Sequence, residues 1–305
     1  MNGVASIGEC MLELSGKDSE WRMGHAGDTF NTLWAMRALL PQARPTDYVS
    51  AFGDDPFSAR QRSFFAAHDI GIAASPVIAG ARPGLYAITL DGHERSFTYW
   101  RADAAARLLA DDPAALAQSL AGRALVYFSG ITLAILAAEA RRTLLSAIGE
   151  ARKAGSLIAF DPNYRPRLWP DASEAREAIG EALGSIDIAL PTFPDEEILF
   201  GDADPAATAA RLATHGVAEI VVKDGTGPAL VVAAGMREAV PAVSVERPVD
   251  TTGAGDSFNG GYLAARLLGH APAEAARRAH RVAAATVQVH GALAPFAVLK
   301  DAFEG

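Results

Sequence analysis

The sequence predicts an α/β protein with a mostly parallel central sheet. From residue 125 onward, short apolar runs alternate with longer stretches that repeat at helical spacing, a pattern typical of parallel sheets. The runs expected to be strands are Leu125–Ser129, Leu157–Asp161, Ile186–Leu190 and Ile220–Lys223. With 305 residues, 50% of them hydrophobic, the chain is long enough to bury a large core around such a sheet.

The first half of the chain adds strands and helices to this pattern. Val4–Ile7 is predicted to be a buried strand, and Tyr48–Phe52 another. Between them, a turn precedes a helix in which Phe30 and Leu33 lie near one face. A longer helix is expected over Ala137–Lys153.

A small antiparallel sheet is predicted beside the main domain. Two alternating runs, Gly84–Leu90 and Glu94–Arg101, flank Asp91-Gly92, a dipeptide typical of a two-residue hairpin turn. The alternating run Met11–Leu14 is expected to join them.

The overall composition excludes several classes of protein. The net charge of −9 comes without a basic stripe, so no nucleic-acid partner is expected. No apolar run approaches the roughly 18–20 residues of a membrane span, and the N-terminus lacks the regions of a signal peptide. The single cysteine, Cys10, excludes an intrachain disulfide and fits a reducing compartment. We therefore expect a cytoplasmic protein with no membrane contact.

One glycine-rich run carries the strongest chemical signal. Asp250–Asp256, with the letters DTTGAGD, follows an alternating run, Val243–Glu246, that is predicted to be a strand. The spacing of Phe258 and Tyr262 predicts a helix directly after it. Glycines let the backbone approach a ligand, and the first N–H groups of a helix bind anions. Asp256 is then either a first-turn acid favoured by the helix dipole or a general base in phosphoryl transfer.

The longer string from Asp250 to Phe258 resembles the C-terminal signature of the ribokinase-like (PfkB) sugar kinases. The resemblance implies a kinase with a single ribokinase-like domain over residues 1–305. Its fold would be a three-layer α/β/α arrangement with a small antiparallel β lid from about residues 10–25 and 82–102. ATP would be the phosphoryl donor and Mg²⁺ a cofactor. In that family the Gly-Ala-Gly segment, here Gly253, Ala254 and Gly255, forms the anion hole, and the next residue, here Asp256, is the catalytic base.

The predicted topology places the candidate residues on one edge of the sheet. In open parallel sheets, ligands bind beyond the carboxyl ends of the strands. The turns after Asp161, Leu190, Lys223 and Asp250 are therefore expected to share one rim.

The turn before the first long helix has two interpretations. In the family this turn contacts the sugar hydroxyls, and Gly27, Asp28 and Asn31 match it, although Ala26 replaces its first glycine. The alternative is a helix capped by Asp28 or Thr29.

Two arginines favour a sugar acid as the substrate. Arg101 and Arg165 each carry a planar guanidinium suited to a carboxylate, which a neutral hexose lacks. The segments around them are similar to those of family members that phosphorylate the terminal 6-hydroxyl of 2-keto-3-deoxygluconate. By that resemblance, Tyr86 and Tyr99 contact the acid together with Gly27 and the two arginines. The tyrosines alternatively cover the apolar face of the small sheet.

The resemblance also assigns residues to the nucleotide and the metal ion. The nucleotide would contact Asn163, Lys223, Gly225, Thr226, Gly227, Gly253 and Gly255. A tight turn between two strands would equally explain the glycines after Lys223. Asp195 is expected to reach Mg²⁺ through water. By the same resemblance, the region around His290 lines the nucleotide or a monovalent cation.

Several alternatives remain open at this level. The substrate could be another sugar acid or a ketohexose, such as 5-keto-2-deoxygluconate or fructose. A sensor without catalytic activity could use the same scaffold. The chain has neither an early strand-linked G-x-G-x-x-G nor a P-loop around Lys223, which argues against a dehydrogenase and a P-loop kinase. A homo-oligomer is expected, either a dimer through the lid or a larger assembly.

Overall fold

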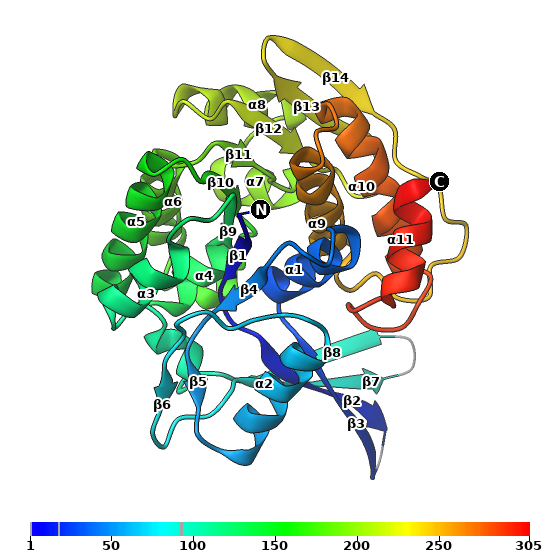
Figure 1. Ribbon diagram of the computed structural model, residues 1–305. Coiled ribbons are helices and arrows are strands. Elements are labelled where there is room, and N and C mark those ends of the chain that lie inside the picture. The colour runs from blue at the N-terminus through cyan, green and yellow to red at the C-terminus, as the bar shows by residue number, and fades with distance from the viewer. Residues whose placement is uncertain (1, 18, 92–93) are drawn as a thin grey trace.

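The computed structural model describes residues 2–17, 19–91 and 94–305. Within them lies a large sheet with the strand order β14-β13-β12-β11-β10-β9-β1-β4 (Figure 1). Its strands are β1 (Val4–Ile7), β4 (Thr46–Val49), β9 (Leu125–Ser129), β10 (Leu157–Asp161), β11 (Ile188–Ala189), β12 (Glu219–Val222), β13 (Ala229–Ala233) and β14 (Met236–Val240). In this sheet β12, β11, β10, β9, β1 and β4 pair in parallel with their neighbours in that order. β13 pairs antiparallel with both β12 and β14. The prediction of a mostly parallel central sheet is confirmed.

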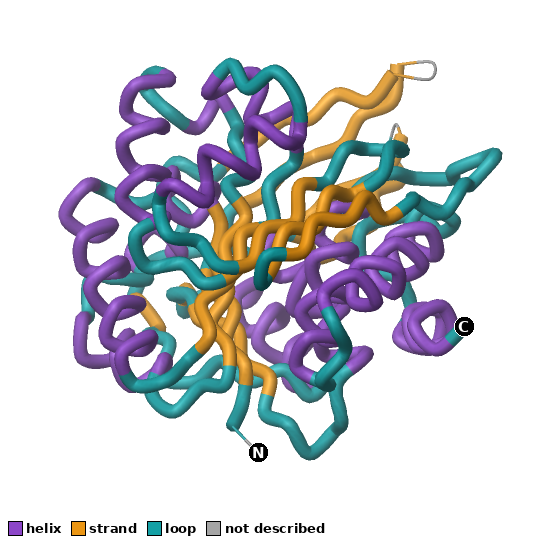
Figure 2. Tube along the Cα trace, turned by 90° about the horizontal axis from the view of Figure 1, so that it is seen from above, coloured by secondary structure: helices purple, strands orange, loops and turns teal. Residues whose placement is uncertain are grey.

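Helices cover both faces of this sheet (Figures 1 and 2). One face carries α1 (Asp28–Leu39), α9 (Ala254–Leu267), α10 (Pro272–Thr286) and α11 (Phe296–Glu304). The other carries α3 (Pro113–Leu120), α4 (Gly130–Ile135), α5 (Ala138–Lys153), α6 (Ala172–Leu183), α7 (Phe193–Phe200) and α8 (Pro205–Thr214). Side chains alternate along each strand, so Tyr127 packs under the first group while Val126 and Phe128 pack under the second. This is the predicted three-layer arrangement.

A second sheet extends from the end of the molecule near α1 and α2 (Pro56–Ala67) (Figure 1). It consists of β2 (Met11–Lys17), β3 (Glu20–Ala26), β7 (Leu85–Asp91) and β8 (Glu94–Trp100). The pairs β2–β3 and β7–β8 are antiparallel, and β2 pairs with β7 in parallel between them. Of the predicted hairpin turn, Gly92 lies outside the described residues. Beside these strands, β5 (Phe52–Gly53) pairs with β6 (Val77–Ile78).

The structure corrects two predicted strands. Val243–Glu246 is not a strand: it lies in an irregular segment after β14, and Val243 is 46% exposed. Its apolar residues alternate in sequence, but no strand in the described part of the chain pairs with it. The predicted strand Tyr48–Phe52 is divided, because the pairing of β4 ends at Val49 and β5 begins at Phe52.

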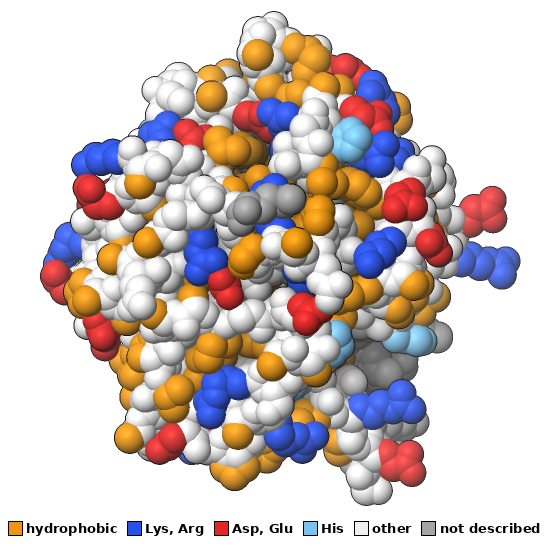
Figure 3. Space-filling view, in the orientation of Figure 1, with side chains coloured by type: hydrophobic (Ala, Val, Ile, Leu, Met, Phe, Trp, Pro, Cys, Tyr) orange, Lys and Arg blue, Asp and Glu red, His pale blue; other side chains and the backbone are white. Residues whose placement is uncertain are grey.

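Acidic and basic side chains are interspersed on the face shown in Figure 3. Among the described residues, no helix has the length and apolar character needed to cross a membrane.

Close packing of α1 against α9 brings two distant parts of the chain together. A Cβ atom on Gly260 of α9 would lie 2.5 Å from the carbonyl oxygen of Thr32 and 2.6 Å from the Cβ of Ala35, both on α1. Only glycine lets the two helix backbones approach this closely at this point. The contact places the first turn of α9 beside the first turn of α1.

We expect Gly260→Ala to separate these helices, because the added methyl group would meet backbone atoms and not the flexible end of a side chain. Overpacking of this kind typically costs about 1–3 kcal/mol of unfolding free energy. Gly149→Ala is the matched control, since a Cβ at Gly149 of α5 would have no heavy atom within 4 Å. It should be neutral, or stabilising by up to about 1 kcal/mol, because alanine favours a helix. Urea denaturation of both variants measures the difference, and equal effects would contradict the proposed contact.

Candidate active site

The glycine-rich run forms an anchored loop that leads into α9. Asp250 holds the loop, because its Oδ1 accepts the N–H of Thr252 (3.0 Å) and its Oδ2 accepts the N–H of Gly291 (3.0 Å). Gly253 is the N-cap residue, with φ +75°, a conformation that favours glycine. Among the described residues no side chain makes a capping hydrogen bond at α9, so the N-terminal end of its dipole can attract an anion.

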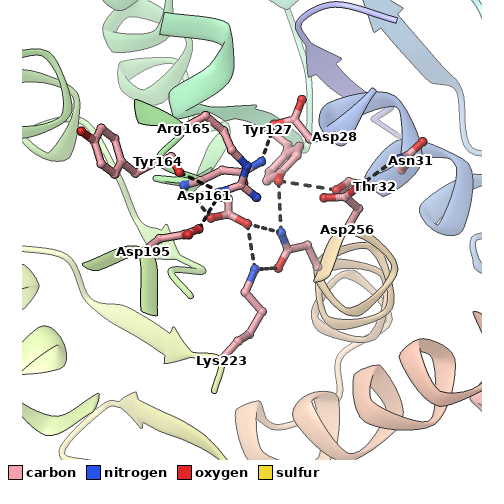
Figure 4. Close-up of polar contacts among 12 residues, drawn as sticks. Asp28, Asn31, Thr32, Tyr127, Asp161, Tyr164, Arg165, Asp195, Lys223 and Asp256 are labelled. Atoms are coloured by element: carbon pink, nitrogen blue, oxygen red, sulfur yellow. Dashed lines mark hydrogen bonds and ion pairs between the residues drawn. The ribbon is translucent and has the colours of Figure 1, made fainter. Parts of the chain in front are cut away.

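Asp256 lies in the first turn of α9 and is held from α1. Its Oδ2 accepts a hydrogen bond from Nδ2 of Asn31 (2.8 Å), and Oδ1 of Asn31 accepts the N–H of Gly27 (3.3 Å) (Figure 4). Burial, reinforced by the nearby charge of Asp28, raises the pKa of Asp256 to about 7. The hydrogen bond from Asn31 and the charge of Lys223 oppose this shift.

The capping alternative for the first turn of α1 is wrong. The N-cap residue is Gly27, and no side chain makes a capping bond there. Oδ2 of Asp28 instead accepts from Nδ2 of Asn163 (2.8 Å), and Oγ1 of Thr29 pairs with the hydroxyl of Tyr48 (3.0 Å). Burial raises the pKa of Asp28. Asp28 therefore joins α1 to the loop after β10.

A buried polar network lies beside the start of α9 (Figure 4). Nζ of Lys223, at the end of β12, donates to Oδ2 of Asp161 (2.7 Å) and to Oδ1 of Asn259 (2.8 Å). Nδ2 of Asn259 also donates to Asp161 (2.7 Å). The ammonium group lies 3.9 Å from the position a Cβ would occupy on Gly255, so a fixed positive charge lies close to the anion-binding turn.

The sequence did not identify Asp161 and Asn259 as site residues. The sequence nevertheless contains a pattern that could have indicated each of them. Asp161 ends an apolar strand at the predicted rim, and Asn259 follows Asp256 by three residues, on the same helix face. The turns after Asp161, Leu190 and Lys223 do share one rim, since Thr192 forms a bridge with Lys223.

Arg165 and Asp195 form an ion pair on the same rim. Nη1 of Arg165 lies 2.9 Å from Oδ2 of Asp195 and also donates to the carbonyl oxygen of Tyr164 (2.7 Å). Burial raises the pKa of Asp195, and Arg165 opposes that shift. Among the described residues, no cluster of three or more His, Cys, Asp or Glu side chains is arranged to hold a metal ion.

The small sheet contributes Tyr86, Tyr99 and Arg101. The hydroxyl of Tyr86 donates to Glu13, and its ring lies 5.6 Å from that of Tyr99. Tyr99 is 48% exposed, whereas Tyr86 beside it is 5% exposed. Arg101 forms an ion pair with the buried carboxylate of Glu9, a residue that the sequence did not single out.

The predicted nucleotide residues Gly225, Thr226 and Gly227 follow Lys223 along the chain. They form the turn between the antiparallel strands β12 and β13, where Gly225 has φ +54° and Gly227 donates to the carbonyl oxygen of Asp224 (2.7 Å). The turn interpretation is therefore sufficient for the glycines. Within the described part of the chain, these residues make no hydrogen bond to Asp256 or to the Lys223 network.

These groups together can bind an anion and remove a proton. The open end of α9 and the ammonium of Lys223 supply positive charge, and Asp256 supplies a carboxylate with a pKa near neutrality. A general base with such a pKa can accept a proton at neutral pH.

Comparison with known proteins agrees with this chemistry. The model of the family described as "pfkB family carbohydrate kinase" matches residues 1–298. The chain is 41% identical to the 2-dehydro-3-deoxygluconokinase of Escherichia coli K12, over 96% of this chain and 97% of that protein. It is 40% identical to the enzyme of the same name from Dickeya dadantii, over 96% of each.

Solved structures agree on the fold. A putative ribokinase II from E. coli has a TM-score of 0.87 at 24% identity, covering 100% of this chain and 99% of that one. A 2-dehydro-3-deoxygluconokinase from Thermotoga maritima has a TM-score of 0.85 at 20% identity, covering 100% of both chains. The predicted ribokinase-like fold is confirmed.

The charge of Asp28 contributes to the raised pKa of Asp256, and this contribution is measurable. We expect Asp28→Asn to lower the pKa of Asp256, because it removes a nearby negative charge that disfavours ionisation. Carboxyl ¹³C NMR titration of Asp256 in both proteins gives the shift. Asp187→Asn is the control and should leave that pKa unchanged. Asp187 lies just before β11, at the amino-terminal ends of the parallel strands. A pKa of Asp256 that is the same with and without Asp28 would contradict the electrostatic explanation.

Proposed function

The chain belongs to the pfkB family of carbohydrate kinases, and we propose that it transfers the γ-phosphate of ATP to the 6-hydroxyl of 2-keto-3-deoxygluconate (2-dehydro-3-deoxygluconate). The product is 2-keto-3-deoxy-6-phosphogluconate. Four relatives named 2-dehydro-3-deoxygluconokinase, 36–41% identical over 96% of this chain, support this substrate. The observation that carries the chemistry is the carboxylate of Asp256 held at the open N-terminus of α9.

Asp256 acts as the general base in this proposal. Asn31 holds its Oδ2, which leaves Oδ1 to accept the proton of the attacking hydroxyl. A pKa of about 7 suits this task, because a base works best when its pKa lies near the operating pH. The phosphoryl group then transfers in line from ATP to the sugar, with no phosphorylated enzyme.

The anion hole stabilises the phosphoryl group during transfer. Gly253, Ala254 and Gly255 form the start of α9, where the N–H of Ala254 donates to the carbonyl oxygen of Thr251 (3.3 Å), and the ammonium group of Lys223, paired with Asp161, lies nearby. Because Asp161 and Asn259 already hold the ammonium group, it requires little reorganisation when charge develops.

The few acidic residues on the rim are consistent with a magnesium ion that takes most of its ligands from ATP and water. A magnesium ion retains several waters and uses only one or two carboxylates beside the nucleotide phosphates. Asp195 is the candidate, acting through water because Arg165 occupies its Oδ2. When bound, Mg²⁺ would neutralise charge on the phosphates. Asn163 and the turn Gly225–Gly227 are proposed to contact the nucleotide. The loop at His290 is a candidate site for a monovalent cation.

The sugar acid is proposed to bind under the small sheet, which serves as a lid. Gly27, Asp28 and Asn31 would contact its hydroxyls, and Tyr86 and Tyr99 would cover it. Arg101 and Arg165 would bind its carboxylate, since each guanidinium has donors that its present carboxylate partner does not use. The protein is proposed to be a cytoplasmic homo-oligomer, in keeping with its buried, unpaired Cys10.

A substrate screen tests the proposed function. Purified protein is incubated with ATP and Mg²⁺, and ADP release is measured with 2-keto-3-deoxygluconate, 2-keto-3-deoxygalactonate, 5-keto-2-deoxygluconate, fructose and ribose. The highest kcat/KM is expected for 2-keto-3-deoxygluconate. Preference for fructose or ribose would reject a carboxylate-binding site, and no turnover with any sugar would favour the non-catalytic sensor.

Asp256→Asn is expected to lower kcat by roughly the 10²–10⁴-fold typical of a general base. The amide keeps the size of the side chain but cannot accept the proton. ATP affinity, measured by calorimetry, should stay close to that of the wild type, because the amides of the anion hole are intact. A variant with near wild-type kcat would remove Asp256 from the mechanism.

A further inference from the structure

Glu9 lies where the chain passes from the central sheet to the small sheet. It follows β1, precedes β2 and is only 2% exposed. Its carbonyl oxygen lies 2.1 Å from the position a Cβ would occupy on Gly27, so this turn packs directly against its backbone. Its carboxylate packs against Gly84, since Oε1 would lie 2.3 Å from a Cβ there. Glu9 thus contacts the turns before both α1 and β7.

The carboxylate of Glu9 is paired with Arg101. Its Oε2 accepts a hydrogen bond from Nη2 of Arg101, the residue directly after β8. The two side chains are 1% and 12% exposed, so water screens their attraction only weakly. Glu9 therefore fixes where the guanidinium of Arg101 lies relative to Gly27 and Gly84.

This ion pair is incomplete. Oε1 of Glu9 and Nε of Arg101 are buried without a hydrogen-bond partner, and the described residues offer Arg101 no second carboxylate. A guanidinium has five N–H donors, and Glu9 uses one of them. A buried polar group without a partner costs free energy, and in a native structure it calls for an explanation such as a ligand or an ordered water.

A structural ion pair in the same protein shows the contrast. Glu219 accepts from Nε and Nη2 of Arg266 in a bidentate arrangement (2.8 and 2.9 Å), and its Oε1 also accepts from the hydroxyl of Tyr262. Both of its oxygens are used. In the pair of Glu9 and Arg101, by contrast, one oxygen and Nε are left without a partner, and the guanidinium keeps donors with which it can meet a second anion.

We propose that Glu9 is a positioning residue that orients the guanidinium of Arg101 toward the carboxylate of the sugar-acid substrate. The inference rests on the proposed function, which supplies that carboxylate. Glu9 holds one edge of the guanidinium and leaves the other donors for the ligand. Because the same residue packs on Gly27, it also sets the distance between the part of the pocket that binds hydroxyls and the part that binds the acid.

The test compares Glu9→Ala with Glu9→Gln. We expect Glu9→Ala to raise the KM for 2-keto-3-deoxygluconate about tenfold to a hundredfold, as for loss of a charge-assisted hydrogen bond that fixes a binding group. The KM for ATP should change less than about twofold, since Glu9 has no part in the anion hole. Glu9→Gln keeps an acceptor oxygen and should recover part of the loss. Glu219→Ala, the matched control, should lower the melting temperature without a selective change in the sugar-acid KM.

A crystal structure of Glu9→Ala supplies a readout that is independent of turnover. The guanidinium of Arg101 is expected to leave the position it has beside Glu9 in the wild type. An unmoved guanidinium, or an unchanged sugar-acid KM in an active enzyme, would overturn the role of Glu9 alone. Should Glu9→Ala fail to fold, the same two measurements on Glu9→Gln decide: we expect a smaller displacement of the guanidinium and a sugar-acid KM about twofold to tenfold higher than in the wild type, and no change in either would overturn the role of Glu9. Wild-type protein that phosphorylates no sugar acid would instead overturn the proposed function, and with it the carboxylate partner of Arg101.

Discussion

The contact between α1 and α9 is the constraint on which the candidate site depends. Asn31 and Asp256 are 225 residues apart in sequence, yet their side chains lie within a 2.8 Å hydrogen bond. The two helices approach because Gly260 has no side chain, and Gly261 allows similarly close packing against α10. The position of the carboxylate is therefore set by the packing of the helices in the core, and much less by the loop that precedes it. A site built on packed helices holds its geometry better than one built on loops alone.

Charge balance is the second feature that shapes the site. The carboxylates of Glu9, Asp28, Asp195 and Asp256 all have raised pKa values, in each case chiefly through burial. Arg101, Arg165 and Lys223 each form an ion pair with one acid, and Figure 4 shows two of these pairs, Arg165 with Asp195 and Lys223 with Asp161. The proposed substrates are both anions, so each cation must hold its acidic partner and still attract a ligand. Incomplete ion pairs meet both requirements, because an arginine engaged on one edge keeps donors on the other.

The sequence predicted the parts of the site that depend on local chemistry. The run Asp250–Asp256 needs glycine where φ is positive and an acid in the first helical turn, and both requirements are visible in the letters. The strand prediction failed where the local pattern had no partner: Val243–Glu246 alternates like a strand, but among the described residues no strand pairs with it. At Asp28, the alternative of a helix cap is wrong because the side chain bonds to Asn163. In both cases a tertiary contact, present or absent, outweighed the local preference.

Fold class, the parallel strands of the central sheet and the candidate base follow from the sequence, because periodicity, turn chemistry and a contiguous motif are all local properties. Only the tertiary structure decides which buried side chains meet. It pairs Glu9 with Arg101 across 92 residues and Lys223 with Asp161 across 62. No spacing rule connects such residues, since the distance between them is fixed by how helices and strands pack and not by the length of chain that separates them.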